Sequence, residues 1–182
     1  IQGKDKGRPD VKVGIGIHRG NLMLGTVGED QRMEGTVISD AVNVGSRLEG
    51  LTKQFGASIV MSEAALNAIQ GEKKFNYRYL GETTVKGKRR SVRVFEVLDG
   101  DEVDSARRKA ITTREFERGV KAFEQGNHTR AAIFFKKVLK INKSDVAAKM
   151  YLVESKKLCV KPTVKGNPQL IPVKDTSKKY RA

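Results

Sequence analysis

Several residue types are scarce in this chain, and each scarcity excludes something. There is no Trp among the 182 residues and aromatic residues make up only 6%, so the core has to consist mainly of Val, Ile, Leu and Phe. Cys159 is the only cysteine, which excludes an internal disulfide and favours a reducing, cytoplasmic compartment. No run of about 18 apolar residues is present, and the charged N-terminal residues are no signal peptide. The missing initial Met indicates that the chain is cut from something longer.

Positive charge is abundant and unevenly placed. The chain carries 36 Lys and Arg against 21 Asp and Glu, a net charge of +15. Residues 1–100 hold 16 basic and 12 acidic residues, or +4, whereas residues 101–182 hold 20 and 9, or +11. This asymmetry is typical of a solvated helical surface with a basic tail; contact with an anionic membrane is the alternative. Nucleic acid is not expected as a partner, because the basic residues are not interleaved with stacking aromatic residues.

The first region, residues 1–99, has the pattern of a mixed α/β domain. Apolar residues alternate with small or polar ones at 11–17, and a second apolar stretch covers 22–27. The short spacing between them predicts that the two strands pair as a hairpin. A polar loop is expected over residues 28–35.

A helix is predicted from Asp40, as its N-terminal cap, to about Phe55, with Gly56 ending it. The apolar residues Val44 and Leu48 fall at helical spacing, so one face of this helix belongs to the core. The rest of the region is expected to form, in order, a strand, a short helix capped by Ser62 and two strands, at residues 58–61, 62–69, 77–80 and 92–97.

The second region, residues 100–158, is predicted to be helical, and the third, residues 159–182, is not. Apolar residues recur at three and four positions in the second region, which indicates a helical hairpin followed by a further helix. These helices are expected at residues 113–125, 129–141 and 145–158. The basic tail contains three of the four prolines of the chain and is expected to be extended and disordered.

The stretch TVISDAVNVGSRLE, residues 36–49, is the most informative for function. Asn43 and Arg47 are four residues apart on the predicted helix, so their side chains project from one face. Thr36 lies just before the helix. An amide and a guanidinium side by side can hold a ribose and a phosphate, and Arg donates two parallel hydrogen bonds to phosphate oxygens.

This stretch resembles the signature TVIGDAVNLASRLE of the class III adenylate and guanylate cyclases. The segments IGIHRG at residues 15–20 and VKGK at 85–88 are also similar to that family, at matching separations. The resemblance covers residues 11–98. It implies the C-terminal half of a cyclase catalytic domain, with an α+β fold of ferredoxin-like origin, followed by the helical region. Ser39 and Gly45 depart mildly from the usual signature.

The resemblance also implies roles for four residues. Arg47 would stabilise the charge that develops on the α-phosphate, and Asn43 would orient the ribose during attack by its 3′-hydroxyl. Thr36 occupies the position that contacts the purine and favours ATP over GTP. Lys86 would contact the terminal phosphates. Cyclic nucleotide and pyrophosphate would be the products, and the catalysis would consist mainly of positioning and charge neutralisation.

The half of the family pattern that binds metal does not occur in this sequence. Class III cyclases hold two Mg²⁺ or Mn²⁺ ions through two aspartates, and neither aspartate motif is present, so we assign no metal ligand. We therefore expect this chain to be inactive alone. The family also implies that the site forms between two catalytic domains, which predicts a second cyclase domain as partner, in a homodimer.

The helical region resembles one tetratricopeptide unit, running from about residue 114 to 145. Glu115 and Lys143 stand where that repeat often has Trp and Pro. A single unit is too short for a stable stack, so it would pack on the cyclase domain or serve in dimerisation or in docking of a protein partner. The residues that carry the resemblance are Gly119, Phe123, Gly126, Ala131, Phe135 and Leu139.

Simpler interpretations stay open for each of these residues. Asn43 and Arg47 could be ordinary solvent-facing helix residues, Thr36 an ordinary strand-edge residue and Lys86 a solvated turn lysine. The helices could form a generic hairpin. The whole protein could also be a degenerate cyclase whose helical region is a protein-interaction module.

Overall fold

The chain folds as a mixed α+β structure with a small sheet and several helices. The computed structural model describes residues 13–27, 34–38, 40–69, 71, 74–84 and 91–160, with the backbone alone at 24–27, 34–38 and 84. In chain order its elements are β1 (Ile15–Ile17), β2 (Met23–Val27), β3 (Glu34–Ile38), α1 (Asp40–Phe55), β4 (Ile59–Ser62), α2 (Glu63–Asn67), β5 (Tyr77–Thr84), β6 (Ser91–Val97), the 3-10 turn η1 (Leu98–Gly100), α3 (Val103–Glu124), α4 (His128–Ile141) and α5 (Val146–Val160).

Four strands form the main sheet in the order β1-β4-β6-β5, with β1 parallel to β4 and the other neighbours antiparallel. Successive side chains of a strand point to opposite faces, so the sheet serves two clusters of buried residues. Val60 and Val94 join the larger cluster with α1 and the three C-terminal helices. Met61 and Phe95 join a smaller cluster with α2.

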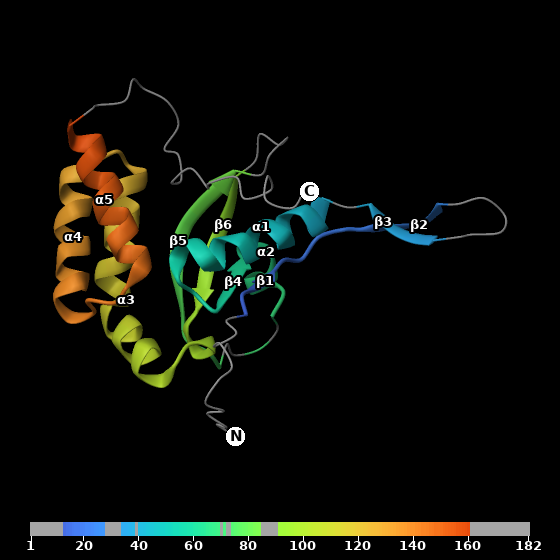
Figure 1. Cartoon of the computed structure of the whole chain (residues 1–182), viewed down its shortest axis with the longest axis horizontal. Coiled ribbons are helices and arrows are strands. Elements are labelled where there is room, and N and C mark those ends of the chain that lie inside the picture. Colours follow the sequence, from blue (N-terminus) through green and yellow to red (C-terminus); the bar gives the residue numbers. More distant parts are fainter. Residues whose placement is uncertain are drawn as a thin grey trace, which may run out of the picture.

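The strand pairing near the N-terminus differs from our expectation. The predicted hairpin between residues 11–17 and 22–27 is wrong: β1 pairs with β4, where Ile15 lies opposite Ile59, and β2 pairs with β3. The chain at 34–38 is therefore a strand, although Glu34 and Gly35 were expected in a loop. Figure 1 shows β2 and β3 as a ribbon that extends away from the rest of the molecule. Pairing with a strand more than 40 residues away leaves no local sequence signal. The short spacing between residues 17 and 22 therefore predicted the wrong partner for β1.

Helix α1 confirms the predicted span, but Asp40 is its first helical residue and not the cap that we expected before it. It runs from Asp40 to Phe55, and Gly56 follows with φ of +61°, a left-handed conformation that glycine adopts without strain. The cap of the next helix is confirmed as well, because the Ser62 hydroxyl accepts a hydrogen bond from the Ala65 amide at 3.2 Å. That helix ends two residues earlier than expected.

The three C-terminal helices lie side by side against the β5 end of the sheet (Figure 1). Helix α3 begins at Val103, ten residues before the predicted start. The apolar pattern failed there because Lys109 and Thr112 occupy buried positions on this helix. Helices α4 and α5 begin and end within two residues of the prediction. None of the helices among the described residues combines the length and apolar composition that crossing a bilayer requires.

Helices α3 and α5 close the exposed edge of the sheet at β5. The backbone amide of Tyr79 donates to the Glu117 carboxylate on α3 at 2.8 Å, and the Tyr151 hydroxyl on α5 donates to the Leu80 carbonyl. An edge strand otherwise presents unpaired backbone groups to other chains. The helices are therefore an integral part of the fold of the described residues.

Candidate functional site

Helix α1 places Asn43 and Arg47 on one face. Val44, Leu48 and Leu51 turn into the core, and the two polar residues occupy the adjoining side of the helix. Residues four apart on a helix have Cβ atoms about 6 Å apart, so the amide and the guanidinium are neighbours. Asn43 is exposed and Arg47 is half-buried. Both side chains are thus at least partly accessible to solvent.

The Arg47 side chain has an unusual environment. Its Nε atom is buried but has no hydrogen-bond partner among the described residues. Leaving a buried donor unsatisfied costs about 1–3 kcal/mol. An acceptor that arrives beside this guanidinium, such as a phosphate oxygen, would remove that cost and gain a charge-assisted hydrogen bond.

The position of α1 is fixed by strand β1, which lies against the helix backbone. A Cβ atom added at Gly16 would lie 2.4 Å from the Glu49 nitrogen and 2.5 Å from the Gly45 oxygen, closer than any side chain tolerates. Gly14 makes a similar approach to Thr52. Gly16 in β1 and Gly14 just before it thus set how near the Asn43 and Arg47 helix comes to the sheet.

His18 connects three elements beside the start of α1. Its Nδ1 atom lies 2.8 Å from the hydroxyl of Ser62, at the end of β4. Its Nε2 atom lies near Gly20, which in turn approaches the Cβ of Ala41. Burial lowers the pKa of His18, so the neutral imidazole is favoured. His18 belongs to the IGIHRG segment that resembles the cyclase family. Its contact with Ser62 depends on the parallel pairing of β1 and β4, which the sequence did not predict.

The other two predicted site residues are placed less completely. The backbone of Thr36 lies in β3, opposite Gly25. Lys86 and the whole VKGK segment lie outside the described residues. The structure places Asn43 and Arg47 four residues apart on α1, and the roles of all four residues stay predictions.

No metal ligand is assigned in this chain. Among the residues that the structure describes, no three His, Cys, Asp or Glu side chains gather as a metal site would require. The aspartates of the N-terminal lead-in, Asp5 and Asp10, lie outside that part of the chain. Because the described side chains offer no such group, we derive no chemical step through a metal.

A cluster of buried charged residues, which the sequence did not predict, joins β5, β6 and α3. Arg78 on β5 donates to Glu96 on β6 at 2.6 Å and to Asp145 at 2.6 Å, and all three side chains are buried. Lys109 of α3 bonds the same Glu96 and also Asp101. A charged residue within a strand or helix is usually solvent-facing, so no local sequence signal predicts this cluster. It joins the sheet to α3 and to Asp145 at the start of α5.

Comparison with known proteins supports the relationship that the motif indicates. The family described as "Adenylate and Guanylate cyclase catalytic domain" matches residues 2–98, more than half of the chain. The chain therefore belongs to the adenylate and guanylate cyclase catalytic-domain family. Its C-terminal helices lie beyond that match.

Individual proteins are similar to parts of this chain. An adenylate cyclase of Anabaena cylindrica is 46% identical over 92 residues, which are 50% of this chain and 18% of that protein. The terminal-differentiation specific adenylate cyclase of Dictyostelium discoideum is 31% identical over 143 residues, 78% of this chain and 7% of its own length. A solved bacterial light-regulated adenylyl cyclase is 25% identical, with a TM-score of 0.43 over 56% of this chain and 28% of that one. The chain thus spans less than a fifth of the two curated relatives.

Proposed function

We propose that this chain is the nucleotide-contacting half of an adenylate cyclase catalytic domain. In the full-length protein the reaction would convert ATP to 3′,5′-cyclic AMP. The ribose 3′-hydroxyl gives up its proton to solvent or to the departing pyrophosphate, and its oxygen forms a bond to the α-phosphorus. The bond between the α-phosphorus and the oxygen that bridges to the β-phosphate breaks, and pyrophosphate leaves with that oxygen. The observation that carries the proposal is the face of α1 on which an exposed amide adjoins a guanidinium with an unsatisfied buried donor.

Arg47 is the residue on which the proposed chemistry rests most. Negative charge increases on the α-phosphate oxygens as the 3′-oxygen approaches, and a fixed guanidinium stabilises that charge more than it stabilises the ground state. Asn43 offers both a donor and an acceptor to the ribose. We assign Thr36 and Lys86 to the site from their positions in the motifs. Thr36 would contact the purine, and Lys86 would contact the terminal phosphates.

The proposed site is completed by another polypeptide segment. Mg²⁺ or Mn²⁺, held by residues other than those described, would supply neutralisation of the triphosphate. A second cyclase domain, in a homodimer, is the partner that we propose for this purpose. The isolated 182-residue chain is accordingly expected to make no cyclic nucleotide.

The test uses the longer parent protein with ATP and Mg²⁺ or Mn²⁺, and measures cyclic AMP formation. Arg47→Ala is expected to lower kcat by at least ~100-fold, as loss of one preorganised charge-stabilising group does elsewhere. Lys53→Ala is the matched control, because Lys53 lies on the same helix and is exposed. An Arg47→Ala enzyme with unchanged turnover would contradict the proposal. Parallel assays with GTP test the preference for ATP that Thr36 predicts.

We further propose that α3 and α4 form a tetratricopeptide-like unit. Two observations support this: a Cβ at Gly119 would lie 2.8 Å from the ring of Phe135, so the helices approach closely, and Ala131 is fully buried. The alignment with the Dictyostelium enzyme takes in 78% of the chain and so must extend past residue 98. Because α3 and α5 hydrogen-bond to β5, deleting α3–α5 should expose the β5 edge and destabilise the cyclase region. Urea unfolding of the truncated chain, compared with the 182-residue chain, measures this.

A further inference from the structure

The outward surface of helix α4 is basic and carries no acidic residue. Between His128 and Ile141 the sequence contains no Asp or Glu. Its four basic side chains are all exposed, and they are Arg130, Lys136, Lys137 and Lys140. Solvated helices commonly offset Lys with Glu three or four positions away. Nothing on α4 itself offsets these charges.

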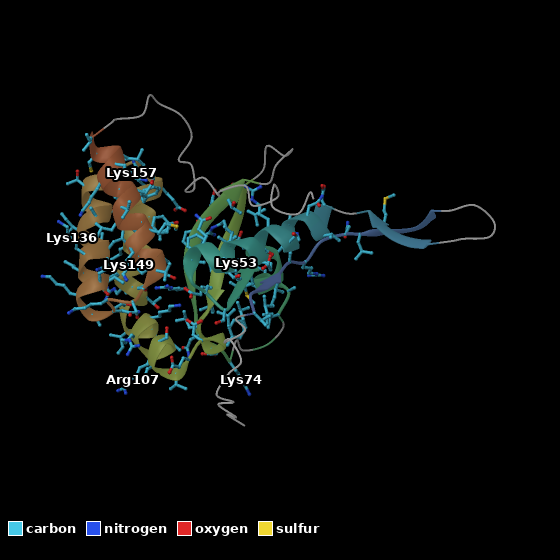
Figure 2. The ribbon with its side chains drawn as sticks, in the orientation of Figure 1. Lys53, Lys74, Arg107, Lys136, Lys149 and Lys157 are labelled. Carbon is cyan, nitrogen blue, oxygen red and sulfur yellow. The ribbon has the colours of Figure 1, made fainter. Side chains whose placement is uncertain are left out.

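Helix α5 also has an exposed surface that is mainly basic. Lys149, Lys156 and Lys157 are exposed on it, and only two acidic residues occur between 128 and 160. Asp145 is buried against Arg78, and Glu154 pairs with Lys157 at 3.2 Å. Figure 2 shows Lys136, Lys149 and Lys157 on these two helices, at the end of the molecule opposite the β2–β3 ribbon. Positive charge on this surface is therefore largely uncompensated.

Exposed aliphatic side chains are interspersed with the lysines. On α4, Ile133 is 51% exposed and lies one helical turn from Lys136 and Lys137. On α5, Val153 is 52% exposed and is spaced four residues after Lys149 and three before Lys156. Both helices bury their other side in the core, and these two aliphatic residues lie outside the buried cluster there. They lie among the charges rather than on a separate face.

We propose that this surface, here called the basic face and comprising Arg130, Lys136, Lys137, Lys140, Lys149 and Lys156, docks on an anionic lipid membrane. A lipid surface is a diffuse layer of negative charge, which matches lysines that are spread along two helices without a specific pocket. Long Lys side chains reach the headgroups while Ile133 and Val153 contact the upper acyl region. Nucleic acid fits less well, because Phe134 is half-buried and flanked by Arg130 and Lys137 instead of being free to stack.

The helices that carry the basic face are fixed to the sheet. Because buried ion pairs and hydrogen bonds attach α3 and α5 to β5, the basic face is held rigidly relative to α1. A membrane bound there would set the orientation of the whole cyclase region. This inference does not depend on the proposed catalytic activity.

The test is sedimentation of the 182-residue chain with vesicles of phosphatidylcholine, with or without 30% phosphatidylserine. Binding is expected only to the anionic vesicles, and it should weaken steeply from low to high salt. The triple substitution Lys136→Gln, Lys137→Gln, Lys140→Gln should weaken it roughly 100-fold, at about fivefold for each lysine near the surface. The matched control removes three positive charges elsewhere, with Lys53→Gln, Lys74→Gln and Arg107→Gln, and should bind within about twofold of the unaltered chain.

A second set of variants separates a membrane from other polyanions. Ile133→Ser with Val153→Ser should weaken vesicle binding severalfold while leaving the charge unchanged. Lys137→Glu alone provides a check should the triple variant lose its helical circular dichroism. The proposal is overturned if the chain ignores anionic vesicles at low salt, or if the control variant loses as much binding as the triple variant. It is equally overturned if duplex DNA or an acidic polypeptide binds as tightly as the vesicles and the two Ser substitutions have no effect.

Discussion

Arg78 and Asp145 form a buried ion pair that fastens the C-terminal helices to the sheet. Nη1 of Arg78 lies 2.6 Å from one carboxylate oxygen of Asp145, and neither side chain is exposed. Burial alone would lower the pKa of Arg78, but Glu96 and Asp145 outweigh it and raise that pKa above its ordinary value. The guanidinium also lies 4.0 Å from the centre of the Phe116 ring. The positive charge of Arg78 is thus neutralised by Glu96 in the sheet and by Asp145 at the start of α5, and this joins the sheet to the helical segment.

Removing the cation should cost more than removing a surface charge. Arg78→Met leaves Glu96 and Asp145 buried with one fewer positive partner, so we expect unfolding free energy to fall by about 3–5 kcal/mol. Urea denaturation followed by circular dichroism measures this. Arg107→Met, on the exposed side of α3, should change stability by less than about 0.5 kcal/mol. Equal effects at the two positions would show that the buried pair has no special role.

Asp145 allows the two parts of its role to be separated. Besides pairing with Arg78, its Oδ1 accepts a hydrogen bond from the Ala148 amide at 3.0 Å and so caps α5. Asp145→Asn keeps an oxygen for the cap, whereas Asp145→Ala loses both functions. We therefore expect the Ala variant to be the less stable by about 1 kcal/mol. Identical melting curves for the two variants would contradict the capping role.

Gly16 and Gly45 provide a matched pair of glycine substitutions at the β1–α1 contact. Gly16→Ala places a Cβ against the helix backbone and should destabilise the chain by at least about 1–3 kcal/mol while displacing Asn43 and Arg47. A Cβ at Gly45 meets nothing within 4 Å, so Gly45→Ala should stabilise the helix by about 1 kcal/mol. Thermal unfolding measures both. A tolerated Gly16→Ala would mean that β1 and α1 are not packed this tightly.

Closure of the β5 edge predicts a local change in hydrogen exchange. Glu117→Ala removes the acceptor of the Tyr79 amide, and a hydrogen bond to a charged group contributes about 1.5–3 kcal/mol. Exchange of that amide should accelerate by at least about tenfold, as followed by NMR. Glu117→Gln keeps an acceptor oxygen and should accelerate it less. Unchanged protection in the Ala variant would show that the helices do not cover this edge.

The histidines predict a pH dependence of stability. Burial lowers the pKa of both His18 and His128 below the ordinary 6.5, so the folded state binds fewer protons than the unfolded state. Their contribution to stability is present above pH 6.5 and is lost as pH falls through the folded-state pKa values. NMR titration should give midpoints below 6.5 for both. His18→Gln and His128→Gln should each reduce the loss of stability on acidification, and a midpoint at or above 6.5 would contradict the burial of that ring.

Much of the fold could be predicted because its signals are local. The ends of α1 follow from Asp40 and Gly56, and the Ser62 cap follows from its position before an apolar turn. Helical spacing alone put Asn43 and Arg47 on one face. The early start of α3 was missed because Lys109 is a charged residue at a buried position, and periodicity counts such a residue as exposed.

The amino-acid sequence by itself determined the family of this chain, its main helices and the pairing of an amide with a guanidinium on one helix face, since each depends on residues within a few positions of one another. Only the tertiary structure decided that β1 pairs with β4, that β2 and β3 form a separate ribbon, and that Arg78 is buried between partners 18 and 67 residues away. Burying a charge is tolerable only where opposite charges converge on it, and such convergence is a property of the folded chain that no local pattern encodes.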